Sequence, residues 1–279
     1  MKHALRILPA VALVAISMFG AMAPAASATI LCPPSPTPGS TLHSNIEVTA
    51  GPNPCVLDHV TVDGSVTVDS DASLFLQNGA VVTGGITIGS GASSLQVAFG
   101  SKVGGAVTLN TAGIVTIASS TLSHGLSGTS ETLDILSSTI NGAVSVTNAG
   151  SFFLCGSQVA GPVQSTGGGL LEIGDRDSPD PLPVVVAAQN GGPVQVYFCA
   201  GNTIAGSLTV NGGVGEIEAN KIGGAGTGTA LTVTNVFMEL EGNTVRGSAV
   251  CTGDTLLGLD DTPPEPSNIF SGKNNGCPL

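Results

Sequence analysis

The stretch Gly201-Asn202-Thr203-Ile204-Ala205-Gly206-Ser207-Leu208-Thr209-Val210 decides the fold of this chain. It contains a turn residue, an apolar residue, a corner glycine and then a short segment in which apolar and hydroxylated residues alternate. Such alternation is the pattern of a strand with one buried face and one solvated face. Degenerate copies of the stretch recur from Val62 to Phe270, which indicates a chain built from one repeated unit.

The apolar residue two positions before each corner glycine marks the period of the repeat. These residues are Val62, Val82, Val103, Leu122, Ile140, Val159, Ile204, Ile222, Val245 and Phe270. One step, from Val159 to Ile204, is 45 residues long, and the others are 18 to 25 residues long. If the long step holds two coils, ten intervals share 270 − 62 = 208 residues, or roughly 21 residues per coil.

The long step is interpreted here as two coils with an added loop. Leu171 and Ile173 would supply the first strand of the extra coil, and Val184 and Val186 would supply its second strand. The proline-bearing segment 175–183 between them is then a surface insertion.

A single coil of this length cannot bury its apolar row, but stacked coils can, with strands ~4.8 Å apart. The sequence therefore predicts an all-β fold, a right-handed parallel β-helix of about eleven coils. The structural rival is a β-sandwich of two sheets whose strands are joined by hairpin turns. The regular period of the repeat argues against it.

Two stretches, Gly201 to Val210 and Gly242 to Val250, match a Gly-Asn-Thr-Val-x-Gly-x-Leu-x-Val unit best. At these residues the chain resembles secreted right-handed β-helix repeat proteins of actinobacteria, most of which have no assigned activity. The segment from Asn268 to Cys277 looks like the closing segment of that family. The resemblance weakens at His124, which replaces a corner glycine, and around 175–183. It implies a fold and export, and it transfers no catalytic residue.

Three regions divide the chain. Residues 1–28 have a basic start, an apolar run and the small-residue site Ala26-Ser27-Ala28, which is the organisation of a secretory signal peptide. The alternative, an N-terminal membrane anchor, would need a longer apolar run. Residues 29–55 are interpreted as a Pro-rich N-terminal arm and cap, with a disordered linker as the alternative, and residues 56–279 as the β-helix domain. We expect a secreted, extracellular protein with no membrane span after signal removal. Association with the cell wall is the alternative localisation.

Charge and composition limit the partners. Without Lys2 and Arg6 the chain has 5 basic and 19 acidic residues, a net charge of −14. This charge would repel phosphate backbones, so we expect no nucleic-acid partner. The chain has no tryptophan, and Tyr197 is its one tyrosine. Its 40 glycines suit many short strands joined by tight corners.

All six cysteines lie beyond the signal segment, and an even number in an exported chain indicates disulfides. Cys32 and Cys55 can pair and hold the arm over the first coil, and Cys251 and Cys277 can close the C-terminal end. The third pair depends on the coil count: with a full coil between them, Cys155 and Cys199 would be ~9.6 Å apart, too far for a bond. Separate thiols are the favoured interpretation, but if the intervening segment loops out, the two cysteines stack and bond.

A row of hydroxylated residues occupies the third position after the corner glycine. The predicted binding face consists of Thr67, Thr87, Thr108, Ser145, Thr209 and Thr232, with Gln164 and Ser127 in the same row. The neighbouring outward position is small, as at Gly85 and Ala106. Such a flat, uncharged face can lie against an extended polysaccharide, an ordered water layer or another protein. The alternative is that threonine simply suits exposed strand positions.

A second row is acidic. Glu216 and Glu239 should stand on adjacent coils, with Asp134 in the same row and Glu172 and Glu218 nearby. Two carboxylates about 5 Å apart are the pair that a retaining glycosidase uses. No arginine, lysine or tryptophan converges on the row, so a solvated face is the preferred interpretation. A catalytic role of Glu216 and Glu239 is kept as the weak alternative.

The candidate metal site is a calcium site, and we expect no other cofactor. Asp175, Asp177 and Asp180 offer hard oxygen ligands in a single loop, but without the spacing of an EF-hand or of a calcium-binding β-roll. An unliganded loop is the preferred interpretation. The histidines are scattered and no nucleophile motif appears, so an enzyme is less expected than a non-enzyme.

We therefore expect a non-catalytic secreted or cell-envelope-associated protein with a structural or adhesive surface role. Its partners would be a cell-wall or extracellular polysaccharide, or another surface protein. The alternatives are an extracellular polysaccharide-active enzyme of the lyase or glycosidase type, and a glycan-binding or ice-binding module.

Overall fold

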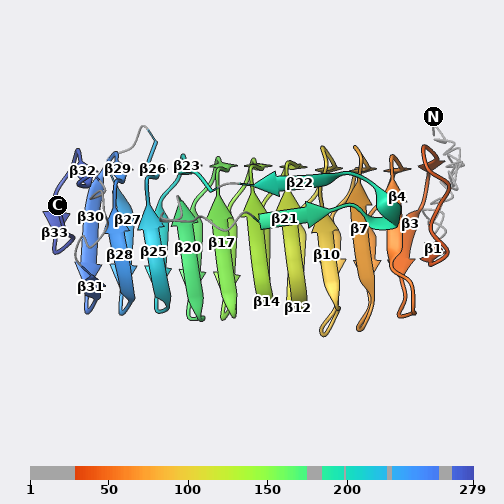
Figure 1. Cartoon of the computed structure of the whole chain (residues 1–279), viewed down its shortest axis with the longest axis horizontal. Helices are drawn as coiled ribbons and strands as arrows, with labels where there is room; N and C mark the ends of the chain where they lie inside the picture. Colours follow the sequence, from red (N-terminus) through yellow and green to blue (C-terminus); the bar gives the residue numbers. More distant parts are fainter. Residues whose placement is uncertain (1–28, 175–183, 198, 225–227, 258–265) are drawn as a thin grey trace, which may run out of the picture.

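The protein is a parallel β-solenoid of about ten turns with about twenty residues per turn, as the repeat predicts. The computed structural model describes residues 29–174, 184–197, 199–224, 228–257 and 266–279. Figure 1 shows the coils stacked along one long axis, with β1 at one end and β33 at the other. Each turn contributes three strands, so the solenoid has three faces.

The narrow face is a ladder of eleven two-residue strands in parallel register. They are β2 (Thr41–Leu42), β5 (Thr61–Val62), β8 (Val81–Val82), β11 (Lys102–Val103), β13 (Thr121–Leu122), β15 (Thr139–Ile140), β18 (Gln158–Val159), β23 (Thr203–Ile204), β26 (Lys221–Ile222), β29 (Thr244–Val245) and β32 (Ile269–Phe270).

The hydroxyl face follows the narrow face in each turn. Its strands are β1 (Thr29–Cys32), β3 (Asn45–Val48), β6 (Val66–Val68), β9 (Ile86–Ile88), the first parts of β12 (Val107–Ala118) and β14 (Leu126–Leu136), β16 (Val144–Thr147), β19 (Val163–Thr166), β24 (Leu208–Asn211), β27 (Thr229–Thr234), β30 (Ser248–Thr252) and β33 (Asn274–Asn275).

The carboxylate face completes the turn. Its strands are β4 (Cys55–Asp58), β7 (Ser73–Gln77), β10 (Ser94–Val97), the second parts of β12 and β14, β17 (Ser151–Cys155), β20 (Leu170–Gly174), β25 (Val214–Glu218), β28 (Phe237–Glu241) and β31 (Thr255–Leu257). Because β12 and β14 run through the corner, the last two faces form one sheet of twenty strands.

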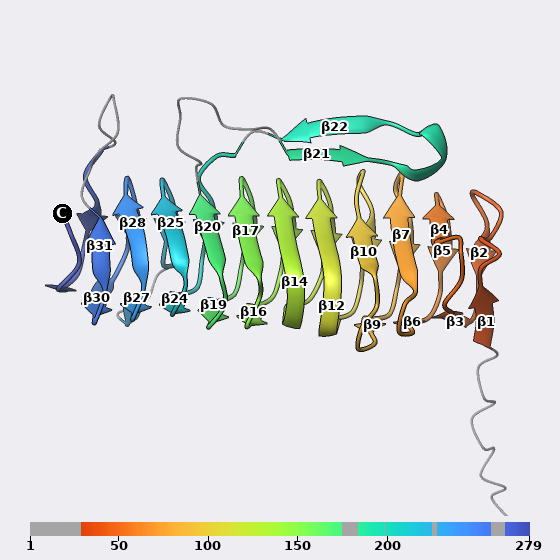
Figure 2. The same cartoon turned by 60° about the horizontal axis from the view of Figure 1, so that its bottom comes forward.

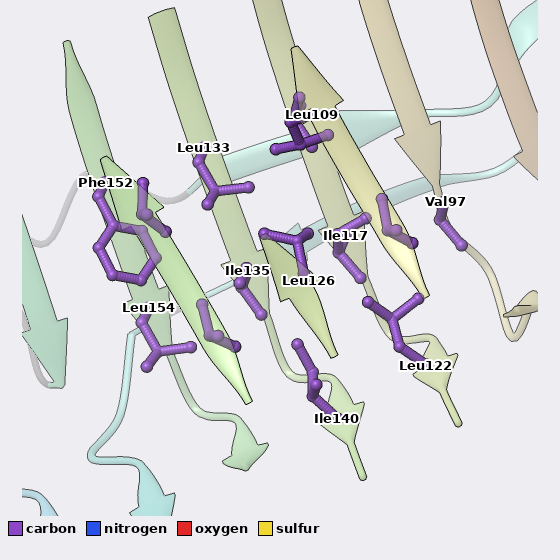
Figure 3. Packing of buried hydrophobic residues seen from close by; sticks show 14 of the residues in the cluster. Val97, Leu109, Ile117, Leu122, Leu126, Leu133, Ile135, Ile140, Phe152 and Leu154 are labelled. Carbon is purple, nitrogen blue, oxygen red and sulfur yellow. The ribbon is translucent and has the colours of Figure 1, made fainter. Parts of the chain in front are cut away.

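The core is a continuous stack of aliphatic side chains inside the coils. Inward residues such as Ile117, Leu122, Leu133 and Ile140 are fully buried, and each touches its counterparts in the turns before and after (Figure 3). Corner glycines allow the turns to approach, since a Cβ at Gly84 would lie 2.6 Å from the carbonyl oxygen of Gly64. The apolar row that no single coil could enclose is thus buried between neighbouring coils.

One corner carries a buried polar ladder that changes residue type along the axis. In the N-terminal half it is built of serines: the amide of Ser138 donates to Ser157 Oγ at 3.1 Å. In the C-terminal half it is built of asparagines. Asn202 Nδ2 donates to Asn220 Oδ1 at 2.9 Å, and Asn220 Nδ2 donates to Asn243 Oδ1 at 3.0 Å. The turn asparagines of successive coils thus stack as a hydrogen-bonded ladder.

The solenoid begins N-terminal of Val56, inside the segment that the sequence assigns to an arm and cap. Strand β1 pairs with β3, β3 pairs with β6, and β2 pairs with β5. The Cys32–Cys55 disulfide forms as expected, and the amide of Val56 donates to Ser35 Oγ at 2.9 Å. The Cys251–Cys277 disulfide also forms as expected and joins β30 to the C-terminal segment. The signal segment 1–28 lies outside the described residues.

The interpretation of the 45-residue step as two coils is wrong. Strand β18 pairs directly with β23, and β20 pairs directly with β25, so only one turn separates Val159 from Ile204. Leu171 and Ile173 do lie in the solenoid, on β20. Val184 and Val186 instead lie on β21 (Val184–Ala187), which forms an antiparallel hairpin with β22 (Val194–Tyr197).

The hairpin lies outside the solenoid and runs parallel to its axis. Figures 1 and 2 show it crossing the ends of β7, β10 and β12, with the 3₁₀ turn η1 (Gln189–Gly191) at its tip. Its inner side chains Val186 and Tyr197 pack on Ala98, Ala118 and Leu136. An isolated hairpin is marginally stable in water, so this packing supplies what the two strands lack.

Polar contacts and a disulfide fix the hairpin along its length. The amide of Gln189 donates to Gln77 Oε1 at 2.8 Å, and Gln96 Nε2 donates to the carbonyl oxygen of Ala187 at 3.1 Å. At the other end Cys199 is bonded to Cys155, which corrects the favoured interpretation of two separate thiols. The cysteines stack because a single turn of the solenoid separates them, while β21 and β22 form a hairpin outside it.

Candidate binding face

The predicted hydroxyl row is one unbroken ladder. Thr67 pairs with Thr87, Thr87 with Thr108, and Thr209 with Thr232. The full row in register is Thr67, Thr87, Thr108, Ser127, Ser145, Gln164, Thr209 and Thr232. These side chains are exposed or half-buried on strands whose alternate residues face the core. The structure therefore brings all six predicted residues onto one face, at a spacing of ~4.8 Å per coil.

A second polar row, which the sequence analysis missed, runs beside the first. Two positions further along the strands, Thr147 pairs with Thr166, Thr166 with Asn211, and Asn211 with Thr234. Residues two apart on a strand are ~6.6 Å apart and point the same way. The signal was present in triplets such as Ser145-Val146-Thr147 and Thr232-Val233-Thr234. The C-terminal half of the face is thus a two-dimensional array of hydroxyl and amide groups.

The hydroxyl face is uncharged and flat. From β6 to β27, the parts of its strands that lie on this face, with β14 counted from Leu126 to Gly128, contain no charged residue within the described part of the chain. The first outward position is small, as at Gly85, Ala106 and Ala143. By contrast, the narrow face carries Lys102 and Lys221 in its outward row. In a chain with 19 acidic residues, this neutral strip can contact a neutral partner without desolvating a charge.

The acidic row also forms, on the carboxylate face. Glu172 pairs with Glu216, and Glu216 pairs with Glu239, so three carboxylates stack on consecutive coils. Asp134 lies in the same row, separated from Glu172 by Phe153. Strand spacing gives neighbouring carboxylates the separation of a retaining pair. Glu239 is 7% exposed, so the row is less solvated than the sequence suggested.

A second pair of glutamates lies two positions further along the same strands. Glu218 pairs with Glu241, and the two side chains are 1% and 2% exposed. Glu218 was expected near the row from the sequence, whereas Glu241 was not. Both are the last residue of a strand and follow an inward-facing residue. Counting positions from the corner glycine does not predict which residues face outward there.

Burial perturbs one carboxyl on this face. Burial raises the pKa of Asp134 from 3.8 to about 6. Its ladder neighbours, Thr116 and Phe153, bring no positive charge to offset the loss of solvent. Asp58, near the N-terminal end of the solenoid, has its pKa shifted in the opposite direction. Burial opposes ionisation of Asp58, but hydrogen bonds from Asn78, His59 and Gln77 outweigh it and hold the pKa of Asp58 below its usual value.

The predicted calcium ligands Asp175, Asp177 and Asp180 lie outside the described residues. Within the described part of the chain, no group of three or more histidine, cysteine, aspartate or glutamate side chains is arranged to hold a metal ion. Calcium binding therefore stays a prediction. Among the same residues, no helix is long and apolar enough to span a bilayer.

Comparisons with protein-family models, with curated proteins and with solved structures find no match to this chain. The fold therefore defines the class, a disulfide-bonded parallel β-solenoid. Its three disulfides are typical of an extracellular, oxidising environment.

Proposed function

We propose that the protein is a non-catalytic, extracellular contact protein whose hydroxyl face lies along an extended neutral polysaccharide. The observation that carries the proposal is the unbroken, uncharged ladder from Thr67 to Thr232. A polymer with equatorial hydroxyls offers a regular series of donors and acceptors. A rigid array that is already ordered loses little conformational entropy on binding such a chain.

Three further features support this role. The face is presented by a solenoid whose strands are fixed by ladders on both sides, so its spacing does not depend on a ligand. Without Lys2 and Arg6 the net charge is −14, which favours solubility and discourages non-specific contact with acidic surfaces. The resemblance of the repeat to secreted β-helix proteins agrees with export.

Co-sedimentation with an insoluble neutral polysaccharide tests the proposal. The double variant Thr87→Tyr/Thr108→Tyr should weaken retention at least tenfold, because bulky rings disrupt the flat face. The matched control is Thr121→Tyr/Thr139→Tyr, which places the same rings on the narrow face. Equal retention of both variants would refute the hydroxyl face as the binding surface.

Two other outcomes would replace the proposal. Inhibition of ice recrystallisation that is lost in Thr87→Tyr/Thr108→Tyr, without polysaccharide retention, would assign the face to ordered water. The second candidate is a glycan-cleaving enzyme, favoured by the stacking of Glu216 on Glu239. Turnover of a polysaccharide that disappears in Glu216→Gln and in Glu239→Gln would establish that candidate.

A further inference from the structure

The β21–β22 hairpin has two apolar faces, and the solenoid covers only one of them. On the inner face, Val186 and Tyr197 are buried against the coils. On the outer face, Val185, Val194 and Val196 are 58%, 60% and 50% exposed. A strand with apolar residues at successive positions is typical of a sheet that is covered on both sides. The outer face of the hairpin is therefore a candidate interaction surface.

The exposed valines belong to one contiguous patch. Val185 lies opposite Val196 in the antiparallel ladder, and Ala187, which is also exposed, lies opposite Val194. Side chains that lie directly opposite each other share one face of the sheet, with Cβ atoms about 5 Å apart, and residues two apart on a strand point the same way. These four side chains form the outer patch, and none of them has a polar atom.

The hairpin is also uncharged. Its segment 184–197 contains no acidic or basic residue, whereas the chain without Lys2 and Arg6 has a net charge of −14. Such a charge makes two copies repel each other, and a contact through a neutral segment adds least to this repulsion. A cationic partner would instead be attracted by the acidic residues elsewhere on the chain. The outer patch therefore fits a second copy of this chain better than a basic protein.

The hairpin is placed where two molecules can meet. Figure 2 shows β21 and β22 outside the coils, side by side along the long axis. They pack on Ala98 and Ala118, at the corner between the carboxylate and narrow faces, so contact at the hairpin leaves the hydroxyl face open. Neither strand contains a charged residue or a proline, the residues that usually prevent an exposed strand from associating with another chain.

We propose that the outer patch is a self-association surface, on which the same patch of a second copy packs face to face. Aliphatic side chains on both sides bury apolar area without leaving a donor, an acceptor or a charge unpaired. Stable interfaces bury roughly 800 Å² on each partner, which is more than four small side chains supply. The dimer is therefore weak and depends on concentration. It does not depend on the proposed function.

Sedimentation velocity of the disulfide-bonded protein over a wide concentration range tests the proposal. The unaltered protein should change from monomer to dimer as its concentration rises. Added salt should favour the dimer, because it screens the repulsion between two acidic molecules. Val185→Glu/Val196→Glu should weaken the dimer at least tenfold, since each copy then brings two carboxylates into the contact. Val185→Thr/Val196→Thr keeps the branched shape, removes apolar area and should weaken the dimer by a smaller factor.

The matched control is Leu170→Glu/Val214→Glu, which adds the same charges to two exposed apolar residues on paired strands of the carboxylate face. This variant should dimerise much more strongly than Val185→Glu/Val196→Glu. Hydrogen exchange at 184–197 checks that the hairpin stays docked in each variant. If the glutamates release the hairpin, the threonine variant decides. A protein that stays monomeric at every concentration, or a dimer that the control weakens as much as the hairpin variants do, would overturn the proposal.

Discussion

Cys155 and Cys199 are 44 residues apart in the sequence, and their Cα atoms lie 5.0 Å apart. This relationship fixes the number of turns, because an additional coil between them would separate the sulfurs beyond bonding distance. The bond also joins the base of the hairpin to the end of β17. The disulfide therefore fixes the inserted β21–β22 hairpin, called the strap below, across four coils.

The first prediction concerns this strap. In Cys155→Ser/Cys199→Ser the solenoid should still fold, because its ladders do not pass through the hairpin. Hydrogen exchange at 184–197 should become much faster, and the protein should lose up to about 4 kcal/mol, the chain-entropy value for a loop of this length. Peptide-resolved exchange mass spectrometry and thermal unfolding measure the two effects. As a control, Cys32→Ser/Cys55→Ser should leave exchange at 184–197 unchanged. Unchanged protection in the first variant would contradict the strap.

The second prediction concerns the asparagine ladder. Asn220 accepts a hydrogen bond from the amide of Asn202 at 3.0 Å and donates one to the carbonyl oxygen of Ile173 at 2.7 Å. Asn220→Ala would leave both buried partners unsatisfied, at a cost of about 1 to 3 kcal/mol each. The unfolding midpoint in denaturant should fall accordingly. Asn141→Ala, at an exposed corner, should have little effect. If the two variants are equally stable, the ladder is not a source of stability.

The third prediction concerns the second polar row on the hydroxyl face. If binding uses the two-dimensional array, Thr166→Tyr should weaken retention on neutral polysaccharide about as much as a ring in the first row does. A ligand that follows only the first row would leave this variant unaffected. Because Thr166 is half-buried, circular dichroism and the thermal midpoint serve as checks that the variant is folded.

The architecture could be predicted from the sequence because two sequence features determine it, the alternation of apolar and polar residues and the length of the repeat. In Val66-Thr67-Val68 the two valine side chains point into the core and the threonine side chain points outward. A step of about twenty residues places the same pattern at the equivalent position of the next coil. The six predicted hydroxyl-bearing residues align because register follows from the apolar positions. The same counting misses Thr147 and Glu241, which lie at strand ends, where strand length varies from coil to coil.

The hairpin could not be predicted in this way. Val184 and Val186 alternate with their neighbours like solenoid strand residues, and the 45-residue step is close to two periods. Alternation does not reveal whether a strand pairs in parallel or antiparallel fashion. That choice depends on long-range packing, here of Val186 and Tyr197 on Ala98 and Ala118. The small side chains of Ala98 and Ala118 leave space for the hairpin, but the sequence around them does not predict that a hairpin packs there.

The last prediction concerns pH. Burial raises the pKa of Asp134 from 3.8 to about 6, so between these values the folded protein holds a proton that the unfolded chain releases. Below pH 4 the carboxyl is protonated in both states and has no cost. As the pH rises from 4 to 6, the free energy of unfolding falls. Above pH 6 the full cost of the buried Asp134 carboxylate applies, on the order of 2 to 3 kcal/mol. Asp134→Asn should therefore stabilise the protein at pH 7 and have little effect at pH 4.

Denaturant unfolding at both pH values measures this difference. Glu131→Gln removes one charge from an exposed position on the same strand, β14, and controls for the overall acidic repulsion. If Asp134→Asn and Glu131→Gln change stability equally at pH 7, the raised pKa does not come from burial. If the effect of Asp134→Asn is the same at pH 4 and at pH 7, the pKa of this carboxyl does not differ between the folded protein and the unfolded chain. The cost assigned here to its charge would then be absent.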